Sequence, residues 1–362
     1  MQRRCVTTPS LILEYETLDS NIGIMTAFAK TRGIGLRPHA KSHKSVEIAR
    51  RLVSAGSLGA CCATIDEAEA LSAGGIGGLL VTSPLSAPHM QQRLAHLLLR
   101  GADLMVVADD AGSVRKLAAI ATAQGCVLPV IVELDVGLGR TGCADIDSAV
   151  EVAKSIAQQS SLKFSGVQAY WGNLQQIMPF EARRQKVEVQ ASKLRTLVAA
   201  LIANGLPPAI VTGGGTGTHW LDASLGMFTE LQAGSFLFMD SCYGPTQLEP
   251  SGNPFAPSLF VAASVVSANQ AGRVTVNAGY KALATDSGKP VPIRGAPMDA
   301  TYSFMGDEHG AVDFKEQPAP VLGDIIEFLT PHCDPTVNLY KCYKVANGDE
   351  IIDEWPISAR GY

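Results

Sequence analysis

Residues 128–170 read LPVIVELDVGLGRTGCADIDSAVEVAKSIAQQSSLKFSGVQAY, and they contain one complete unit of the pattern that decides the fold. An apolar run ending at Leu134 is followed by a helical pattern over Ile146–Gln158 and by a second apolar run ending at Tyr170. Runs that are continuously apolar, rather than alternating, are typical of parallel strands buried on both faces. The stretch therefore predicts a strand–helix–strand unit.

The same unit recurs from Leu18 to Ser241. Strand-like segments end near Arg37, Ala63, Thr82, Val107, Leu134, Tyr170, Thr212 and Ala233. Helical patterns between them include Ser45–Ala55, Ile65–Ala73, Met90–Arg100, Ala111–Ala123, Ile146–Gln158 and Ala182–Asn204. Eight units in series predict an α/β fold with a closed (β/α)8 barrel, since the alternative, an open doubly wound sheet, usually has fewer strands.

The pattern changes after Gly244. Residues Pro245–Pro257 are rich in Pro, Gly and Ser and predict a linker. Strand patterns without long helices follow at Ser258–Ala268, Arg273–Asn277, Ile325–Leu329 and Tyr340–Val345. We therefore expect a barrel domain over 18–245 and a mainly β domain formed by 256–362 together with 1–17, whose strand Ser10–Tyr15 pairs with it.

Composition excludes several function classes. The chain has 362 residues, 46% of them hydrophobic, and a net charge of -5, which leaves no basic surface for nucleic acid or an anionic membrane. No apolar stretch approaches the roughly 20 residues of a membrane helix, and the N-terminus lacks the apolar core of a signal peptide. Eight cysteines without a CxxC pair are too dilute for a disulfide scaffold, which predicts reduced thiols in a cytoplasmic enzyme.

The first barrel strand ends in Arg37–Lys44, RPHAKSHK. In a barrel, functional residues lie at the carboxyl ends of strands, so Lys41 is well placed to form a Schiff base. The neighbouring His39, His43 and Lys44 are expected to lower the pKa of Lys41 toward the neutral amine that carbonyl chemistry needs. The competing interpretation is a solvated basic loop.

The seventh strand ends in a glycine-rich turn, Thr212–Thr218. Such a turn offers unobstructed backbone N–H groups, and the helix that follows adds its positive end, at the position that barrels favour for phosphate. The next turn, Gly234–Ser235, adds a further contact. A lysine and a phosphate site in one barrel together indicate a phosphorylated aldehyde cofactor, although a flexible loop is the alternative for the turn alone.

Two further clusters stand apart. Arg140 is flanked by glycines after the fifth strand, where it either approaches a ligand oxygen or pairs with Asp135. His332 and Asp334 would share one face of a strand, and an imidazole with a carboxylate forms half of a shell for Mn²⁺, Mg²⁺ or Zn²⁺. A surface His–Asp pair is the simpler alternative.

Taken together, these motifs resemble the D-threonine aldolase family, within the wider group of eukaryotic-type D-serine dehydratases and alanine racemase. The resemblance runs over nearly the whole chain. It rests on Thr8–Leu11, Arg37–Lys41, Gly139–Arg140, Gln168–Tyr170, Thr212–Gly217, Glu230–Ser235, Asp307–Gly310, His332–Thr336 and Ile357–Gly361.

The resemblance implies a homodimeric pyridoxal 5'-phosphate enzyme assisted by a divalent metal. Lys41 would carry the cofactor, Arg140 would contact its phenolic oxygen, and Tyr170 would lie near its ring. The residues that would complete the cofactor site are His39, Thr212, Gly214, Gly215, Thr216, Gly217, Gly234 and Ser235. His332 and Asp334, in the second domain, would bind the metal; the dehydratases usually read His-x-Cys, which Cys333 does not satisfy.

The substrate side departs from the family pattern. Trp171 and Gln176 stand where the aldolases carry histidines, and the second of those resembles the general base that takes the β-hydroxyl proton. Gln does not titrate near neutral pH, so that role is vacant. Tyr280, in Asn277–Tyr280, is expected to narrow the substrate pocket.

The resulting hypothesis is retro-aldol cleavage of a D-configured β-hydroxy-α-amino acid to glycine and an aldehyde. The expected catalytic residues are Lys41, Tyr170 and His309, where His309, another histidine or a metal-bound hydroxide replaces the missing base. Dehydration to an oxo acid and ammonia, or racemisation, is the alternative on the same site. A non-catalytic cofactor carrier is a third, although such carriers usually consist of the barrel alone.

Overall fold

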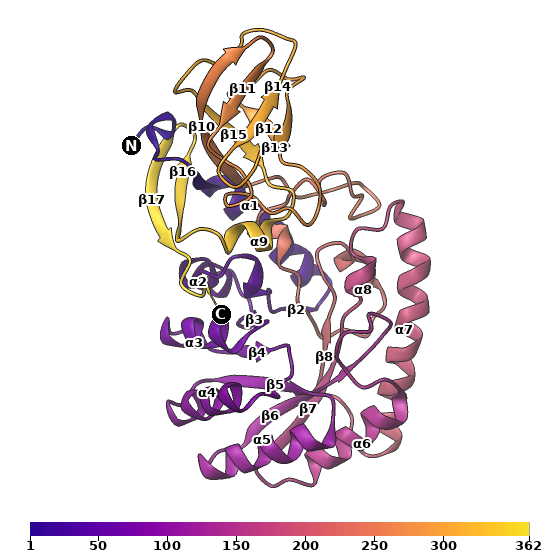
Figure 1. The fold of residues 1–362 in the computed structure, drawn as a ribbon. Helices are drawn as coiled ribbons and strands as arrows, with labels where there is room; N and C mark the ends of the chain where they lie inside the picture. Colours follow the sequence, from indigo (N-terminus) through magenta and orange to yellow (C-terminus); the bar gives the residue numbers. More distant parts are fainter. Residues whose placement is uncertain (362) are drawn as a thin grey trace.

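Eight parallel strands form one of the two sheets in the computed structural model, which describes residues 1–361 (Figure 1). They are β2 (Gly35–Leu36), β3 (Cys61–Cys62), β4 (Leu79–Val81), β5 (Leu104–Ala108), β6 (Leu128–Leu134), β7 (Leu162–Ala169), β8 (Ile210–Gly213) and β9 (Glu230–Leu231). The spatial order runs from β2 through β9 and then stepwise down to β3. A parallel bridge between His39 and Cys61, with Cys61 N donating to Pro38 O at 2.9 Å, joins the two ends. The predicted closed barrel is confirmed.

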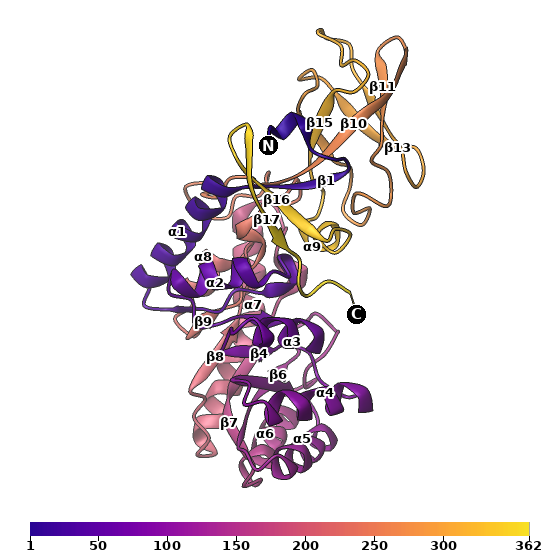
Figure 2. The ribbon, with the colours of Figure 1, turned by 90° about the vertical axis from the view of Figure 1, so that its left-hand side faces the viewer.

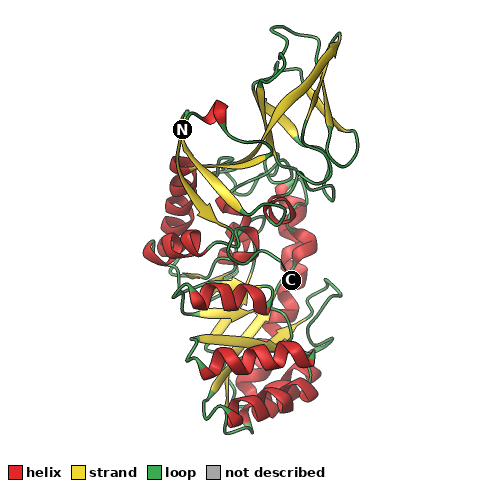
Figure 3. Ribbon diagram, turned by 60° about the vertical axis from the view of Figure 1, so that its left-hand side comes forward, coloured by secondary structure: helices red, strands yellow, loops and turns green. Residues whose placement is uncertain are grey.

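Helices flank this barrel (Figure 3). They are α1 (Tyr15–Thr31), α2 (Val46–Ser54), α3 (Ile65–Ala73), α4 (Pro88–Leu99), α5 (Ala111–Ala123), α6 (Ile146–Ala157), α7 (Phe180–Ala203) and α8 (His219–Ser224). Three of these helices begin at a capping side chain: Thr64 accepts from Glu67 N, Asp110 from Gly112 N, and Asp145 from Ser148 N. These bounds agree with the predicted helices to within a few residues.

The second sheet has nine strands and lies beyond the barrel mouth (Figures 1 and 2). They are β1 (Ser10–Glu14), β10 (Leu259–Gln270), β11 (Arg273–Val276), β12 (Val291–Arg294), β13 (Thr301–Phe304), β14 (Gly310–Asp313), β15 (Ile325–Leu329), β16 (Cys342–Asn347) and β17 (Glu350–Pro356). Strand β1 pairs antiparallel with β10 and parallel with β16, so the expected pairing of the N-terminal strand is confirmed. The residue boundaries of the two domains stay a prediction.

The sequence patterns differ from the structure in two places. The segment predicted to be a linker is packed rather than free: Phe255 is buried against Phe236, with ring centroids 5.6 Å apart. The segment after β15, expected to be a strand, forms the short helix α9 (Cys333–Val337), with His332 as its N-cap. Helix α9 lies between the second sheet and the barrel mouth (Figure 1).

No helix within residues 1–361 is long and apolar enough to cross a membrane.

Candidate active site

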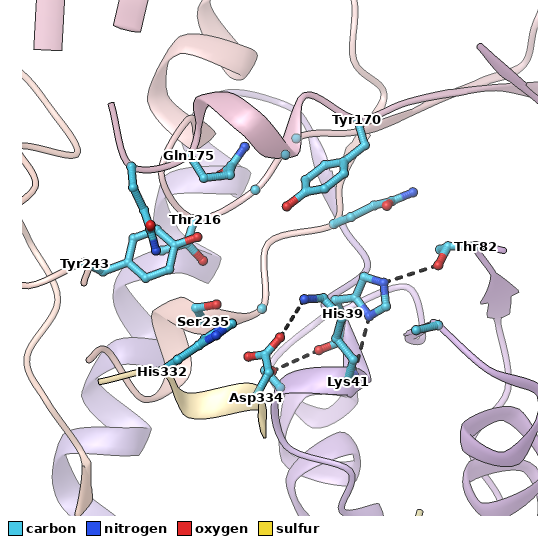
Figure 4. Close-up of a pocket in the computed structure, with 18 of the residues that line it drawn as sticks. His39, Lys41, Thr82, Tyr170, Gln175, Thr216, Ser235, Tyr243, His332 and Asp334 are labelled. Carbon is cyan, nitrogen blue, oxygen red and sulfur yellow. Dashed lines mark hydrogen bonds and ion pairs between the residues drawn. The ribbon is translucent and has the colours of Figure 1, made fainter. Parts of the chain in front are cut away.

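A cavity of about 310 Å³ opens at the carboxyl ends of the barrel strands, and α9 supplies one wall (Figure 4). Most of the residues singled out in the sequence line it. They are His39, Lys41, Arg140, Tyr170, Gln176, Gly214, Gly215, Thr216, Gly234, Ser235, His332 and Asp334. Residues far apart in the chain therefore meet where a barrel carries its chemistry.

Lys41 lies on the short 3-10 helix Ala40–Ser42, and its Nζ donates to Asp334 Oδ2 at 2.5 Å. The Asp334 carboxylate raises the pKa of Lys41 well above its ordinary value. The expectation that neighbouring cations lower this pKa is wrong. Burial lowers the pKa of His39 and of His43 to about 3, which leaves both neutral, and Lys44 is paired with Glu67 at 2.9 Å.

His39 supports the lysine loop from inside the cavity. Its Nδ1 accepts a hydrogen bond from Lys41 N at 3.4 Å, and its Nε2 lies 3.3 Å from Thr82 Oγ1. Both ring nitrogens of His39 are hydrogen-bonded and the ring is neutral. His39 therefore orients the backbone of the lysine loop and adds no positive charge to the cavity.

The glycine-rich turn forms a cradle of amides. Within residues 1–361, the amides of Gly214, Thr216 and Ser235 have no hydrogen-bond partner, and all three residues line the cavity. Gly214 has φ +71°, a conformation that favours glycine, and a Cβ there would lie 2.4 Å from Asp222 Oδ2. Unpaired amides that face a cavity are what a phosphate requires, so this part of the site fits the phosphate of pyridoxal 5'-phosphate.

Arg140 lies over the ring of Tyr170, with 5.8 Å between its Cζ and the ring centroid. The alternative pairing with Asp135 is not formed, because that carboxylate accepts hydrogen bonds from the amides of Gly137, Leu138 and Gly139. Burial raises the pKa of Tyr170, so its phenol keeps its proton near neutral pH.

His332 and Asp334 come together at the start of α9 and line the same cavity as the amide cradle (Figure 4). His332 Nδ1 lies 2.6 Å from Asp286 Oδ2, which leaves Nε2 for another partner. Asp334 Oδ1 is buried without a hydrogen-bond partner. Burial raises the pKa of Asp334, but the Lys41 ammonium outweighs it and brings this pKa below its ordinary value.

These donors fit a divalent cation held by two protein ligands. Among residues 1–361 there is no group of three His, Cys, Asp or Glu side chains arranged to hold a metal. An imidazole nitrogen and an orphaned carboxylate oxygen would therefore need water or substrate to complete the shell.

Five of the predicted site residues lie outside the cavity lining. Trp171, expected in the substrate pocket, is fully buried behind the cavity wall, where its Nε1 donates to Asp222 Oδ1 at 2.9 Å. Thr212 Oγ1 accepts a hydrogen bond from Gln232 Nε2, and the Gly217 amide is held by Gln175. These three residues support the cavity from behind because their polar groups are already engaged.

Tyr280 and His309 lie in loops that connect strands of the second sheet, outside the cavity lining of their own chain. Tyr280 is 49% exposed and stacks on Phe304, with ring centroids 4.9 Å apart, so it does not narrow the pocket of this chain. His309 is exposed in the turn between β13 and β14.

Comparisons with known proteins now bear on these features. Residues 14–242 match the family model described as "Alanine racemase, N-terminal domain", and residues 258–346 match "Putative serine dehydratase domain". The chain is 38% identical to a 3-hydroxy-D-aspartate aldolase of Paracoccus denitrificans (strain Pd 1222), over 98% of this chain and 92% of that protein. It is 36% identical to a D-threonine aldolase of Arthrobacter sp, over 99% and 93% of the two chains. The chain belongs to the D-threonine aldolase family.

The solved structures agree with this family. A D-threonine aldolase from Filomicrobium marinum superposes with a TM-score of 0.94 at 34% identity, over 99% of this chain and 96% of that chain. Pyridoxal 5'-phosphate is the cofactor expected of an alanine racemase-like aldolase.

Several residues that line the cavity were not among the site residues predicted from the sequence. Gln168 and Gln232 line the cavity, and Gln232 Nε2 donates to Gln168 Oε1 and to Thr212 Oγ1, both at 3.0 Å. Tyr243 and Gln175 also line the cavity. The positions of Gln168 and Gln232 at predicted strand ends were a usable signal; those of Gln175 and Tyr243 were not, because they lie in loops without a pattern.

Proposed function

We propose that this chain is a pyridoxal-phosphate-dependent lyase that cleaves a D-β-hydroxy-α-amino acid to glycine and an aldehyde. The observation that carries the proposal is the meeting of Lys41 and Asp334 in the cavity that the unpaired amides of the glycine-rich turn also line. Its relatives, at 38% and 36% identity along nearly the full chain, are named as aldolases.

The cofactor would be held at three places. Lys41 is the attachment point, the amides of Gly214, Thr216 and Ser235 face the phosphate, and Arg140 beside Tyr170 is in place for the phenolic oxygen. When bound, pyridoxal phosphate supplies an electron sink for the bond that breaks at Cα. Neutral His39 fixes the backbone of the lysine loop through Lys41 N.

The metal site would use His332 and Asp334, with Mn²⁺, Mg²⁺ or Zn²⁺ as candidates. Such an ion supplies Lewis acidity toward the substrate β-oxygen. Asp286 would hold the His332 ring in the tautomer that presents Nε2, since it already bonds Nδ1 at 2.6 Å.

The proton of the β-hydroxyl has no obvious acceptor among the cavity side chains. Gln176 does not titrate, and His39 stays neutral with both nitrogens engaged. His309 lies outside the cavity of its own chain. Lys41 donates a hydrogen bond to the Asp334 carboxylate, and its raised pKa means that it holds its proton tightly until the cofactor is attached.

One observation favours dehydration as a second candidate. A reaction begun by removal of the Cα proton would use Lys41 and would not need a base at the position of Gln176. A D-threo-3-hydroxyaspartate dehydratase of Delftia sp. (strain HT23) is 28% identical to this chain over 96% of both proteins.

Product identification tests the proposal. Purified protein with pyridoxal phosphate and Mn²⁺ would be given D-threonine, D-phenylserine and D-3-hydroxyaspartate, and the products would be separated by mass. Glycine with an aldehyde supports the lyase, whereas oxo acid with ammonia, or the L-enantiomer, replaces it by the dehydratase or the racemase. Lys41→Ala is the control, because it removes the attachment point and should abolish turnover while Asp334 and His332 stay in place to bind the metal.

We also propose a homodimer in the cytoplasm. Large apolar side chains in the loops that connect strands of the second sheet are exposed, among them Met298 at 99%, Leu322 at 67% and Val321 at 60%, which supports a covering partner. The eight cysteines are free thiols, as a reducing compartment requires. Light scattering of the holoenzyme tests the dimer.

A further inference from the structure

Along residues 214–217 of the glycine-rich turn, amides without a hydrogen-bond partner alternate with amides that donate a hydrogen bond to a side chain. Gly215 N donates to Asp222 Oδ2 at 3.3 Å, and Gly217 N donates to Gln175 Oε1 at 2.9 Å. Gly214 N and Thr216 N, which alternate with them, have no partner in residues 1–361. Two buried side chains therefore determine which amides remain available to a ligand.

Gln175 is the first of these side chains. It follows the short 3-10 helix Gly172–Leu174 and is buried, with its Nε2 donating to Thr218 Oγ1 at 3.0 Å and to Trp171 O at 3.3 Å. The turn packs tightly around it, since a Cβ on Gly217 would lie 1.8 Å from Gln175 O. The side chain reaches the turn only because glycines leave it room (Figure 4).

Asp222 is the second. It lies on α8, is fully buried, and accepts from Trp171 Nε1 at 2.9 Å and from Thr218 Oγ1 at 2.6 Å. Trp171 thus contacts both side chains, one through its indole N–H and the other through its carbonyl oxygen. No charged partner is needed for this arrangement, because three donors converge on one carboxylate.

We propose that Gln175 and Asp222, braced by Trp171, are positioning residues that set the phosphate-binding amides of Gly214 and Thr216. A turn with four glycines is intrinsically mobile, and ordering it at the moment of binding would weaken affinity. The two side chains order it beforehand. The inference rests on the proposed function, because it takes pyridoxal phosphate as the ligand.

The experiment compares pyridoxal phosphate with pyridoxal, which lacks the phosphate. Both would be titrated into the metal-free apoprotein and followed by absorbance and tryptophan fluorescence. In Gln175→Met and in Asp222→Asn, the Kd for pyridoxal phosphate should rise at least about tenfold, and in Trp171→Phe at least about threefold. The Kd for pyridoxal should stay within about twofold of the wild type in all three.

Trp355→Phe is the matched control. Trp355 Nε1 donates to Asp353 Oδ2 at 2.8 Å, so this change removes the same type of hydrogen bond at a site remote from the turn. It should leave both affinities unchanged.

Each outcome is decisive. Equal weakening of both ligands would show a general structural role and overturn the inference, as would unchanged affinity for pyridoxal phosphate. A wild type that binds neither ligand would overturn the proposed function itself. If Gln175→Met does not fold, Asp222→Asn and Trp171→Phe carry the same comparison.

Discussion

Lys41 Nζ lies 2.5 Å from Asp334 Oδ2, so the residue proposed to carry the cofactor is bonded to a residue proposed to carry the metal. The two side chains come from the barrel and from α9, and each shifts the pKa of the other in the direction that favours the ion pair. If Lys41 carries the aldehyde cofactor as proposed, an imine with at most one N–H would replace the ammonium. The ion pair with Asp334 would then be weaker, and the carboxylate would be more available to a cation.

The first prediction follows from this shared carboxylate. Mn²⁺ should bind the holoenzyme at least about fivefold more tightly than the apoprotein, because the cofactor removes the competing ammonium. Isothermal titration of both forms measures the difference. Lys41→Ala apoprotein should bind Mn²⁺ as tightly as the wild-type holoenzyme, whereas equal affinities of the two wild-type forms would contradict the coupling.

The second prediction concerns Asp286. Asp286→Asn should weaken Mn²⁺ binding by about 10–100-fold, because His332 loses the carboxylate that fixes its ring. Titration of the holoenzyme with Mn²⁺ gives the affinity. Asp147→Asn, on the outer helix α6, is the control, and an effect of the same size there would refute the specific role of Asp286.

Gln176 gives the third prediction. Gln176→His should raise kcat/KM for D-threonine by about 10–100-fold and introduce an inflection near pH 6.5, since a histidine there can accept the β-hydroxyl proton. Initial rates between pH 5.5 and 9, chosen to span about one unit below the histidine pKa, report both quantities. Gln176→Asn should show neither change. A variant without the new inflection would exclude this position as the place of the missing base.

The fourth prediction concerns the stability of the barrel. Arg37 and Glu230 form a buried two-pronged ion pair, with both nitrogen–oxygen distances 2.9 Å. Glu230→Gln should reduce the free energy of unfolding by about 3–5 kcal/mol, because it leaves the guanidinium buried without its counter-charge. Urea denaturation measures the loss. Glu181→Gln, which breaks the exposed pair with Arg184, should leave the urea midpoint unchanged, and an equal shift there would contradict the prediction.

The fifth prediction is a pH dependence. Burial raises the pKa of Asp222 to about 7, although it accepts hydrogen bonds from Thr218 and Trp171. In the unfolded chain the value is about 3.9. The folded state therefore binds the proton more tightly, and this contribution to stability is full below about pH 4 and is lost as the pH rises through about 7.

Calorimetry of the apoprotein tests this sign. Because Asp222→Asn cannot ionise, its Tm should fall less between about pH 5 and pH 8 than that of the wild type. Asp147→Asn should retain the wild-type slope. Identical slopes for wild type and Asp222→Asn would show that another group controls the pH dependence.

Much of the barrel was predictable because its strands are continuous apolar runs and because α3, α5 and α6 begin at capping residues. The shortest elements were not. Helix α9 has five residues, too few for a helical period, and its proline stands in the first turn, where helices tolerate it. The strands β12, β13 and β14 have four residues each and no clear alternation.

The site likewise contains residues that the sequence could identify and contacts that it could not. Lys41, His332 and Asp334 were identifiable from local motifs, but the pair between Lys41 and Asp334 joins positions 293 residues apart. The reversed pKa of Lys41 follows from that contact and not from its sequence neighbours. Gln175 and Asp222 were invisible as site residues, because a buried polar side chain acquires its role only from the donors that surround it.

The way in which the barrel closes bears on when the proposed site is complete during synthesis of the chain. Strand β2, just before Lys41, has β9 as its neighbour, and the ring closes through the bridge between His39 and Cys61. A nascent chain that ends before β9 would contain Lys41 but not the turn at Ser235. A chain that ends before α9 would lack Asp334. The proposed cofactor and metal sites are therefore complete only once the chain has been made through α9 and the ring has closed.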